Sequence, residues 1–377
     1  MRIASISLSV FELPAVTRMF RLVEERAPQA QRWRLVYEPR GREQIHVLHV
    51  MTDEGIEGVS TVGDARYTQM RAEDLAQLRL LTIGEDALAR ERLWAKLSFA
   101  TRYTFSAQGW AGAFDNCLWD IAGKVAELPV WRMIGAARPE AAAYMNYFGE
   151  TLDAALADAE RCWAAGWRVL KDHYAGDATA NMAWFDATRR RLPDAVLLHD
   201  AALCMYSDAE ALAVGECLQR NGYRWYEEPI ADRRLAALQH LCSRLAIPVA
   251  ACETFMNDHA LCAEWLAAGA ADILRGNARH GTTPLIALAR MCAERGAAIE
   301  LNGPGGLFGL IHVHLCCGLG PTTWYEAFPG GMRDALGKEI GLTNPPQPAP
   351  AMPPPSGFGW GAEWDRPYFE KVRLGVL

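Results

Sequence analysis

AVLLHD (residues 195–200) and YRWYE (residues 223–227) are two short, largely apolar runs that each end in an acidic residue. Six further runs of this kind lie before and after them, and each ends in a polar residue. The eight run-end residues recur at intervals of 24 to 27 and are Asn146, His173, Asp200, Glu227, Glu253, Asn277, Asn302 and Glu326. A strand, a helix and their loops need about 25 to 30 residues, so this period predicts eight successive strand–helix units.

Each interval between these runs also contains a helical pattern. In TLDAALADAERCWAAG (residues 151–166), the apolar Leu152, Leu156 and Trp163 lie on one helical face, and Gly166 ends the helix. Alternating strands and helices predict an α/β fold, and eight even units favour a parallel barrel over an open, doubly wound sheet. Active sites of such barrels lie at the carboxyl ends of the strands, where the eight polar residues fall.

The segments on either side of this pattern have a different character. Residues 1–14 alternate apolar residues with serine, which predicts a half-buried strand, and residues 45–64 predict a hairpin. A long amphipathic helix is expected from Trp110 and must end before Pro129. The proline-rich residues 342–360 predict an extended segment that runs back over the surface.

The composition is that of a soluble globular protein, with 51% hydrophobic and 22% charged residues. A net charge of −7 argues against a nucleic-acid or anionic-membrane partner, because either would favour a basic surface. The ten cysteines show no CxxC spacing, which indicates buried free thiols in a reducing cytoplasm. We therefore expect a cytoplasmic homo-oligomer whose partner is a small molecule.

Three of the run-end residues indicate a metal site. Asp200, Glu227 and Glu253 end consecutive predicted strands and are expected to converge at the barrel mouth, where three carboxylates need a cation among them. An all-oxygen set without His or Cys favours Mg²⁺. For each residue alone, a solvated acid at a strand end is the alternative. Glu228, which precedes Pro229, is expected to turn toward the next loop.

The order of these residues resembles the enolase superfamily, on its mandelate racemase and sugar-acid dehydratase side. The resemblance rests on Asp200 followed by EEP (227–229) and CE (252–253), and it covers nearly the whole chain. Further matching segments are the helix GAFDNCLWDIAGKVAELPVWRMIGA (112–136), the hairpin TDEGIEGVS (52–60) and the closing SGFGW (356–360).

The resemblance implies a particular division of the chain. The fold would be a modified TIM barrel, (β/α)7β, with an α+β capping domain. The cap is expected over residues 1–130, the barrel with the metal site over 131–340, and the segment 341–377 is expected to return to the cap.

The resemblance also implies the chemistry, which is removal of the proton beside a substrate carboxylate through an enediolate, with Mg²⁺ on the three acids. In KDH (171–173), Lys171 matches a lysine that contacts the substrate carboxylate, and His173 stands in the place of the base. The two face the same side of a strand, and a histidine near its usual pKa of about 6.5 is a competent base. Glu326 matches an acid that hydrogen-bonds the substrate carboxylate or the intermediate.

The opposite side of the barrel departs from this family pattern. Mandelate racemase relatives have an Asp and a His where this chain has Asn277 and Asn302, and an asparagine cannot act as a base. A one-base reaction therefore fits best: dehydration of a sugar acid to a 2-keto-3-deoxy acid by a Mg²⁺-dependent lyase. The alternatives are a cycloisomerase, a racemase or epimerase, and a degenerate barrel that binds metal and acid without turnover.

Substrate contacts are expected from both parts of the chain. Asn146, Asn277 and Asn302 would contribute them from the barrel, and Arg18 from the cap. The cap loops that would set substrate identity are expected within residues 14–34 and 60–70, where Arg21 and Arg66 also lie. His259 and His280 are expected to be loop residues.

Overall fold

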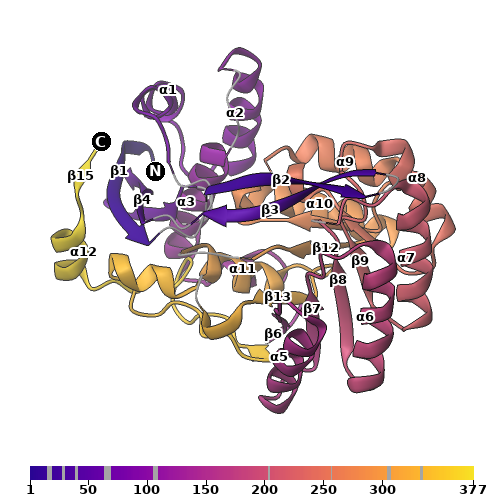
Figure 1. Cartoon of the computed structure of the whole chain (residues 1–377). Coiled ribbons are helices and arrows are strands. Elements are labelled where there is room, and N and C mark those ends of the chain that lie inside the picture. Colours follow the sequence, from indigo (N-terminus) through magenta and orange to yellow (C-terminus); the bar gives the residue numbers. More distant parts are fainter. Residues whose placement is uncertain are drawn as a thin grey trace.

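The computed structural model describes residues 1–14, 19–27, 30–38, 41–62, 69–104, 109–202, 204–255, 257–303, 307–331 and 334–377. Within these segments, eight parallel strands follow one another around a nearly closed barrel, with β13 beside β6 (Figure 1). The strands are β6 (Ala141–Asn146), β7 (Val169–Asp172), β8 (Val196–Asp200), β9 (Trp225–Glu227), β10 (Val249–Ala251), β11 (Ile273–Gly276), β12 (Ala298–Leu301) and β13 (Trp324–Ala327). The predicted α/β barrel is confirmed.

Seven helices return the chain from one barrel strand to the next, and this gives the predicted (β/α)7β order (Figure 1). They are α5 (Leu152–Ala164), α6 (Ala178–Arg191), α7 (Asp208–Arg220), α8 (Leu235–Arg244), α9 (His259–Ala267), α10 (Thr282–Arg295) and α11 (Leu307–Gly318). Several begin with a side chain that accepts a backbone N–H bond, as Thr151, Asp177, Ser207 and Asp258 do. These caps place the strand-to-helix turns just beyond the carboxyl ends of the strands.

The remaining gap in the barrel lies between β12 and β13. The Ile299 N–H donates to the Pro321 carbonyl at 3.1 Å. The buried Glu300 carboxylate accepts the N–H groups of Thr323 at 3.1 Å and Trp324 at 3.0 Å. A side chain therefore supplies acceptors where the last two strands meet.

The barrel encloses a small core of its own. Its buried members are Tyr144, Leu198, Trp225, Ala250 and Ile273. A larger core lies between the strands and the surrounding helices. Because strand side chains alternate between faces, polar residues near the strand ends can point into the barrel without disrupting the outer core.

The cap contains a four-stranded antiparallel sheet in the order β15-β1-β4-β5. Its strands are β1 (Ile3–Pro14), β4 (Arg42–Thr52), β5 (Glu57–Thr61) and β15 (Gly375–Val376), and its helices are α1 (Ala72–Thr82), α2 (Arg90–Thr104), α3 (Gly109–Ala126) and α4 (Val130–Met133). The predicted strand, hairpin and helix are all confirmed. The hairpin turns at Gly55, whose φ of 81° lies in the left-handed region that glycine adopts readily.

The C-terminal segment connects the barrel to the cap. Short strand β14 (Ala351–Met352) pairs with β6, and helix α12 (Arg366–Val372) follows. Strand β15 then pairs antiparallel with β1, with Val376 opposite Ser9. The proline-rich stretch thus spans from a barrel strand to the cap.

Helix α3 holds the cap, the barrel and the tail together. The buried Asp120 carboxylate accepts the N–H of Val59 in β5 at 3.1 Å and the N–H of Trp360 in the tail at 3.0 Å. Gly112 lies so close to the barrel that a Cβ there would be 2.0 Å from the Arg279 carbonyl oxygen. Small and acidic residues on this helix therefore fix the cap above the barrel.

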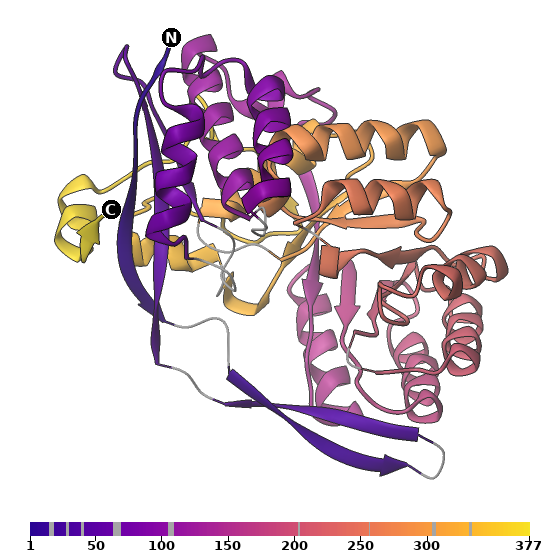
Figure 2. The ribbon, with the colours of Figure 1, turned by 90° about the horizontal axis from the view of Figure 1, so that it is seen from above.

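Residues 14–34, expected as a cap loop, instead contain most of a hairpin. Strands β2 (Met19–Ala27) and β3 (Ala30–Glu38) form their own two-stranded sheet, which extends away from the cap sheet (Figure 2). Exposed Phe20 and Leu22 flank the charged Arg21, and the high charge of the segment obscured the strand pattern.

No helix in the described segments is both long and apolar enough to cross a membrane. All ten cysteines carry free thiols that are buried or partly buried, as the sequence predicted.

Candidate metal and proton-transfer site

The polar run-end residues gather at the carboxyl ends of the barrel strands. Asn146, Asp200 and Glu227 are the last residues of β6, β8 and β9. His173, Asn277 and Asn302 each follow the last residue of a strand, Glu253 begins the short 3-10 helix η1 (Glu253–Phe255), and Glu326 lies within β13. The periodic pattern thus located the carboxyl end of every barrel strand to within two residues.

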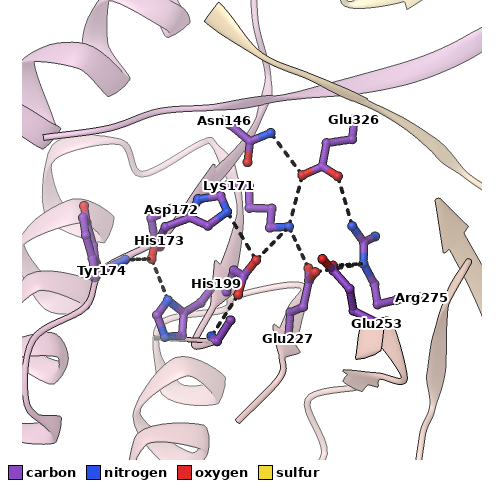
Figure 3. Close-up of polar contacts among 12 residues, drawn as sticks. Asn146, Lys171, Asp172, His173, Tyr174, His199, Glu227, Glu253, Arg275 and Glu326 are labelled. Carbon is purple, nitrogen blue, oxygen red and sulfur yellow. Dashed lines mark hydrogen bonds and ion pairs between the residues drawn. The ribbon is translucent and has the colours of Figure 1, made fainter. Parts of the chain in front are cut away.

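Lys171 lies at the centre of this group (Figure 3). Its Nζ is 2.9 Å from Glu227 Oε2, 3.1 Å from Asp200 Oδ2 and 3.2 Å from Glu326 Oε1. Burial alone disfavours the ammonium, but the carboxylates of Glu227 and Glu326 outweigh it and raise the lysine pKa well above its usual range. Lys171 is therefore a buried cation that joins three strand ends.

His173 lies beside Lys171 but is open to solvent. Its Nε2 is 3.3 Å from Asp200 Oδ2, and its ring stacks on Phe148 with 5.4 Å between centroids. The His173 side chain is 27% exposed, whereas that of Lys171 is 2% exposed. Burial raises the pKa of Asp200, but the charges of Lys171 and His173 hold it well below its usual range. The imidazole is thus partly exposed at the mouth, with Nε2 next to an ionised carboxylate and Nδ1 buried.

Arg275, which the sequence analysis did not single out, is the second buried cation of the site (Figure 3). Its Nε lies 2.8 Å from Glu227 Oε1 and its Nη2 lies 3.1 Å from Glu326 Oε2, with no part of the side chain exposed. Nη2 also donates to Tyr144 Oη at 3.3 Å. Arg275 precedes Asn277 by two residues, as Lys171 precedes His173, so both side chains point to the same side of the sheet as the strand-end residues.

Glu227 lies inside the barrel, as predicted. Both of its oxygens face cations, and the side chain is fully buried. Burial raises the Glu227 pKa to about 7 against the opposing effect of Arg275 and Lys171. The carboxyl therefore depends on these two neighbours to remain ionised.

Glu228 lies just beyond β9, at the start of the next turn. Its backbone adopts a φ of 44°, and its N–H donates to the Ala250 carbonyl at 2.8 Å. Burial, then the charges of Glu253 and Asp200, raise its pKa well above the usual range. The left-handed turn at the strand end thus keeps this carboxyl in the field of the other acids, which residue type alone does not reveal.

The acids have the chemistry of a divalent-cation site but are not gathered into one. Among the described residues, no three His, Cys, Asp or Glu side chains lie close enough to hold a metal ion. Lys171 and Arg275 instead pair with the acids. Asp200, Glu227 and Glu253 offer only oxygens, and the charges of Asp200 and Glu253 raise the Glu227 pKa, a repulsion that a cation would relieve. These three would hold Mg²⁺ after a rearrangement of the ion pairs.

The asparagines are engaged with one another and with the site. Asn277 Nδ2 donates to Asn302 Oδ1, and the Arg279 N–H donates to Asn277 Oδ1 at 2.9 Å. Asn146 Nδ2 donates to Glu326 Oε1 at 3.1 Å and to the Ala327 carbonyl at 2.9 Å. Asn146 therefore orients Glu326, and the other two form a buried amide pair.

The other candidate residues lie elsewhere. Arg18 and Arg66 are outside the described residues. His280, expected in a loop, is buried in the 3-10 helix η2 (Ala278–His280), with Nε2 3.7 Å from Cys262 Sγ. His259, also expected in a loop, is the first residue of α9, and its ring packs edge-on against Trp94.

Comparisons with known proteins agree with the observed fold. Residues 154–368 match the family described as enolase C-terminal domain-like, and residues 19–135 match the mandelate racemase / muconate lactonizing enzyme N-terminal domain. The chain is 28% identical over 223 residues to an arabinonate dehydratase of Saccharolobus solfataricus, covering 56% of this chain and 59% of that protein. It is 30% identical over 210 residues to a D-galactarolactone cycloisomerase of Agrobacterium fabrum, covering 51% and 53%. These matches span less than two thirds of either relative.

Solved structures share the complete architecture. The crystal structure of D-glucarate dehydratase from Agrobacterium tumefaciens, complexed with magnesium, superimposes with a TM-score of 0.79 at 26% identity and covers 100% of both chains. A racemase from Streptomyces coelicolor A3(2) with bound magnesium has the same fold, with a TM-score of 0.76 at 17% identity over 99% of this chain and 100% of that one. The chain belongs to the enolase superfamily, on its mandelate racemase and sugar-acid dehydratase side.

Proposed function

We propose that this protein is a Mg²⁺-dependent lyase that dehydrates a sugar acid to a 2-keto-3-deoxy acid. The observation that carries the proposal is the position of His173, whose side chain is partly exposed at the barrel mouth and whose Nε2 lies 3.3 Å from Asp200 Oδ2. The likeness to proteins named arabinonate dehydratase and D-glucarate dehydratase supports the same reaction class.

His173 is the proposed base. Its imidazole takes the proton from the carbon beside the substrate carboxylate, and the electron pair of that C–H bond moves into the carboxylate as an enediolate. The neighbouring carbon then loses its hydroxyl, which leaves as water with a proton returned by His173. The resulting enol becomes the keto acid. One histidine can perform both transfers because it alternates between base and acid.

Mg²⁺ held by Asp200, Glu227 and Glu253 would supply charge stabilisation for the enediolate oxygens. Lys171 adds a fixed positive charge behind the same position, and its raised pKa keeps it protonated. Glu326, oriented by Asn146, is proposed to accept a hydrogen bond from the substrate. The substrate would thus lie between His173 and these buried charges.

The opposite side of the mouth favours elimination over racemisation. Inversion at the α-carbon requires a group that returns a proton to the other face, and Asn277 and Asn302 form a hydrogen-bonded amide pair there. An amide has no proton-transfer capacity near neutral pH.

A cycloisomerase is the second candidate, because a D-galactarolactone cycloisomerase is among the relatives. It would use the same α-proton abstraction but expel a ring oxygen instead of a hydroxyl. Both eliminations give a 2-keto-3-deoxy acid, so the two reactions are distinguished by mass: dehydration releases one water from the substrate, whereas the cycloisomerase product is an isomer of it.

The test is incubation of the purified protein with a library of acid sugars and lactones in D₂O with Mg²⁺. We expect a 2-keto-3-deoxy acid from at least one substrate, and we expect His173→Asn to abolish its formation. His240→Asn, at an exposed position on α8, is the matched control and should retain full activity. The absence of both keto acid and α-deuterium from every compound would leave the non-catalytic barrel as the better explanation.

A further inference from the structure

Lys171, Glu227, Arg275 and Glu326 form a closed ring of alternating charge inside the barrel (Figure 3). Lys171 contacts Glu227 Oε2 at 2.9 Å, and Arg275 contacts Glu227 Oε1 at 2.8 Å. On the other side, Lys171 contacts Glu326 Oε1 at 3.2 Å, and Arg275 contacts Glu326 Oε2 at 3.1 Å. Each anion therefore binds both cations through different oxygens. We call these four residues the charge ring.

The charge ring is electrically neutral and almost completely dry. Its side chains are between 0% and 3% exposed. Buried ions of this kind are tolerated only when each is paired, and removal of one partner leaves an uncompensated charge. The two cations of the charge ring therefore neutralise the acids in this part of the barrel mouth.

The ring shares one member with the proposed metal site. Glu227 belongs to both, whereas Asp200 and Glu253 lie outside the ring. Arg275 Nε is also 3.9 Å from Glu253 Oε2, so this guanidinium is near two of the three proposed ligands. A divalent cation that binds Glu227 must compete with Arg275 for the carboxylate and is repelled by the guanidinium charge.

We propose that Arg275 is a positioning residue that keeps the acids assembled in the metal-free protein and lowers their affinity for Mg²⁺. The inference rests on the metal site of the proposed function, but not on turnover. It follows that the barrel mouth is folded before the cation arrives, and that cation binding exchanges one ion pair for another.

Two neutral variants test this proposal with opposite expected signs. Arg275→Met removes a cation, so the metal-free protein should melt at a lower temperature while its affinity for Mg²⁺ rises about tenfold or more. Glu326→Gln removes an anion and leaves both cations to Glu227, so Mg²⁺ affinity should fall by about tenfold or more. Arg275→Lys, which keeps the charge, should remain close to the wild type in Mg²⁺ affinity.

The measurements are calorimetric titration with MgCl₂ alone and thermal unfolding in EDTA and in saturating MgCl₂. Arg295→Met, at an exposed position on α10, controls for loss of an arginine. Arg275→Met should show a larger Mg²⁺-induced rise in melting temperature than wild type. If it binds Mg²⁺ no more tightly than wild type, or if Glu326→Gln binds it as tightly, the proposal is wrong. The Glu326→Gln arm decides the question if Arg275→Met does not fold.

These readouts separate the inference from the proposed function. A protein that binds Mg²⁺ as described, but exchanges no α-proton, would contradict the function and leave the role of Arg275 intact. A protein that dehydrates a sugar acid, but whose Mg²⁺ affinity is the same with and without Arg275, would do the reverse.

Discussion

Asp172 and His199 form a buried ion pair on the outer side of strands β7 and β8, with 2.6 Å between Oδ1 and Nδ1. They are also partners in the register of these two strands. The next residues along the chain, His173 and Asp200, face each other inside the barrel. Because consecutive side chains point to opposite sides, the outer pair fixes the register in which the inner pair meets.

We expect His199→Gln to lower the free energy of unfolding by about 3–5 kcal/mol, because it leaves the buried Asp172 unpaired. The double variant Asp172→Asn/His199→Gln should be less destabilised than His199→Gln alone, since neither charge remains. Urea unfolding of the wild type, His199→Gln, Asp172→Asn and the double variant measures the coupling. A double variant whose destabilisation equals the sum of those of the two single variants would show that the pair contributes no coupling.

His314 predicts a loss of stability in acid. Its Nδ1 accepts the Trp131 N–H at 3.1 Å, its Nε2 lies 3.2 Å from the Trp360 carbonyl oxygen, and burial lowers its pKa to about 4. The folded-state pKa is below the unfolded value of about 6.5, so between these two pH values the folded protein binds fewer protons than the unfolded chain. The contribution of the neutral His314 to the free energy of unfolding is therefore fully present above about pH 6.5. It is lost as the pH falls toward 4, and the total loss is about 3 kcal/mol.

The measurement is denaturant unfolding at several pH values between 7 and 4. His314→Gln, which cannot titrate, should show a shallower decline than the wild type over this window. His240→Gln serves as the exposed control and should follow the wild type. A wild-type slope that His314→Gln does not change would assign the acid sensitivity to other groups.

Asp120 predicts that strand β5 and the tail loosen from helix α3 together. Asp120→Ala leaves the N–H groups of Val59 and Trp360 without their acceptor, at a cost of about 1–3 kcal/mol for each. Asp120→Asn, which retains one acceptor oxygen, should cost less. Hydrogen exchange followed by mass spectrometry should show faster exchange at both segments in Asp120→Ala, while the outer barrel helix α6 keeps its protection. Faster exchange at only one segment would contradict the joint role.

The amide pair of Asn277 and Asn302 marks the positions at which a second proton-transfer group can be introduced. In Asn277→Asp/Asn302→His, an acid and an imidazole replace two amides that already hydrogen-bond to each other. We expect this variant to return deuterium to the substrate α-carbon with inversion, so that the epimer appears in NMR spectra beside the keto acid. Asn277→Asp alone lacks the imidazole and should give no epimer.

The sequence was sufficient to locate the strand ends because each strand–helix unit has nearly the same length. A polar residue near the mouth ends each largely apolar run, so the period located Asp200 and Glu227. The hairpin of β2 and β3 was missed because it buries little, and burial is what makes a hydrophobic pattern visible.

The ion pairs of the site could not be predicted from the period of the strands. Arg275 lies within an apolar run, and its importance comes from Glu227 and Glu326, which are 48 and 51 residues away in the sequence. Glu228 stays among the acids because of a left-handed backbone turn, which glutamate adopts only when surrounding structure imposes it. Such contacts depend on neighbours in three dimensions, which a single sequence does not identify.

The pairing of β15 with β1 has a consequence for synthesis on the ribosome. Leu8 and Leu377 exchange backbone hydrogen bonds of 3.1 and 2.9 Å beside this pair, so the edge of the cap sheet is covered by residues translated after every barrel strand. Until they emerge, β1 presents an open strand edge to other nascent chains. All eight barrel strands therefore precede in the sequence the strand that covers this edge of the cap sheet.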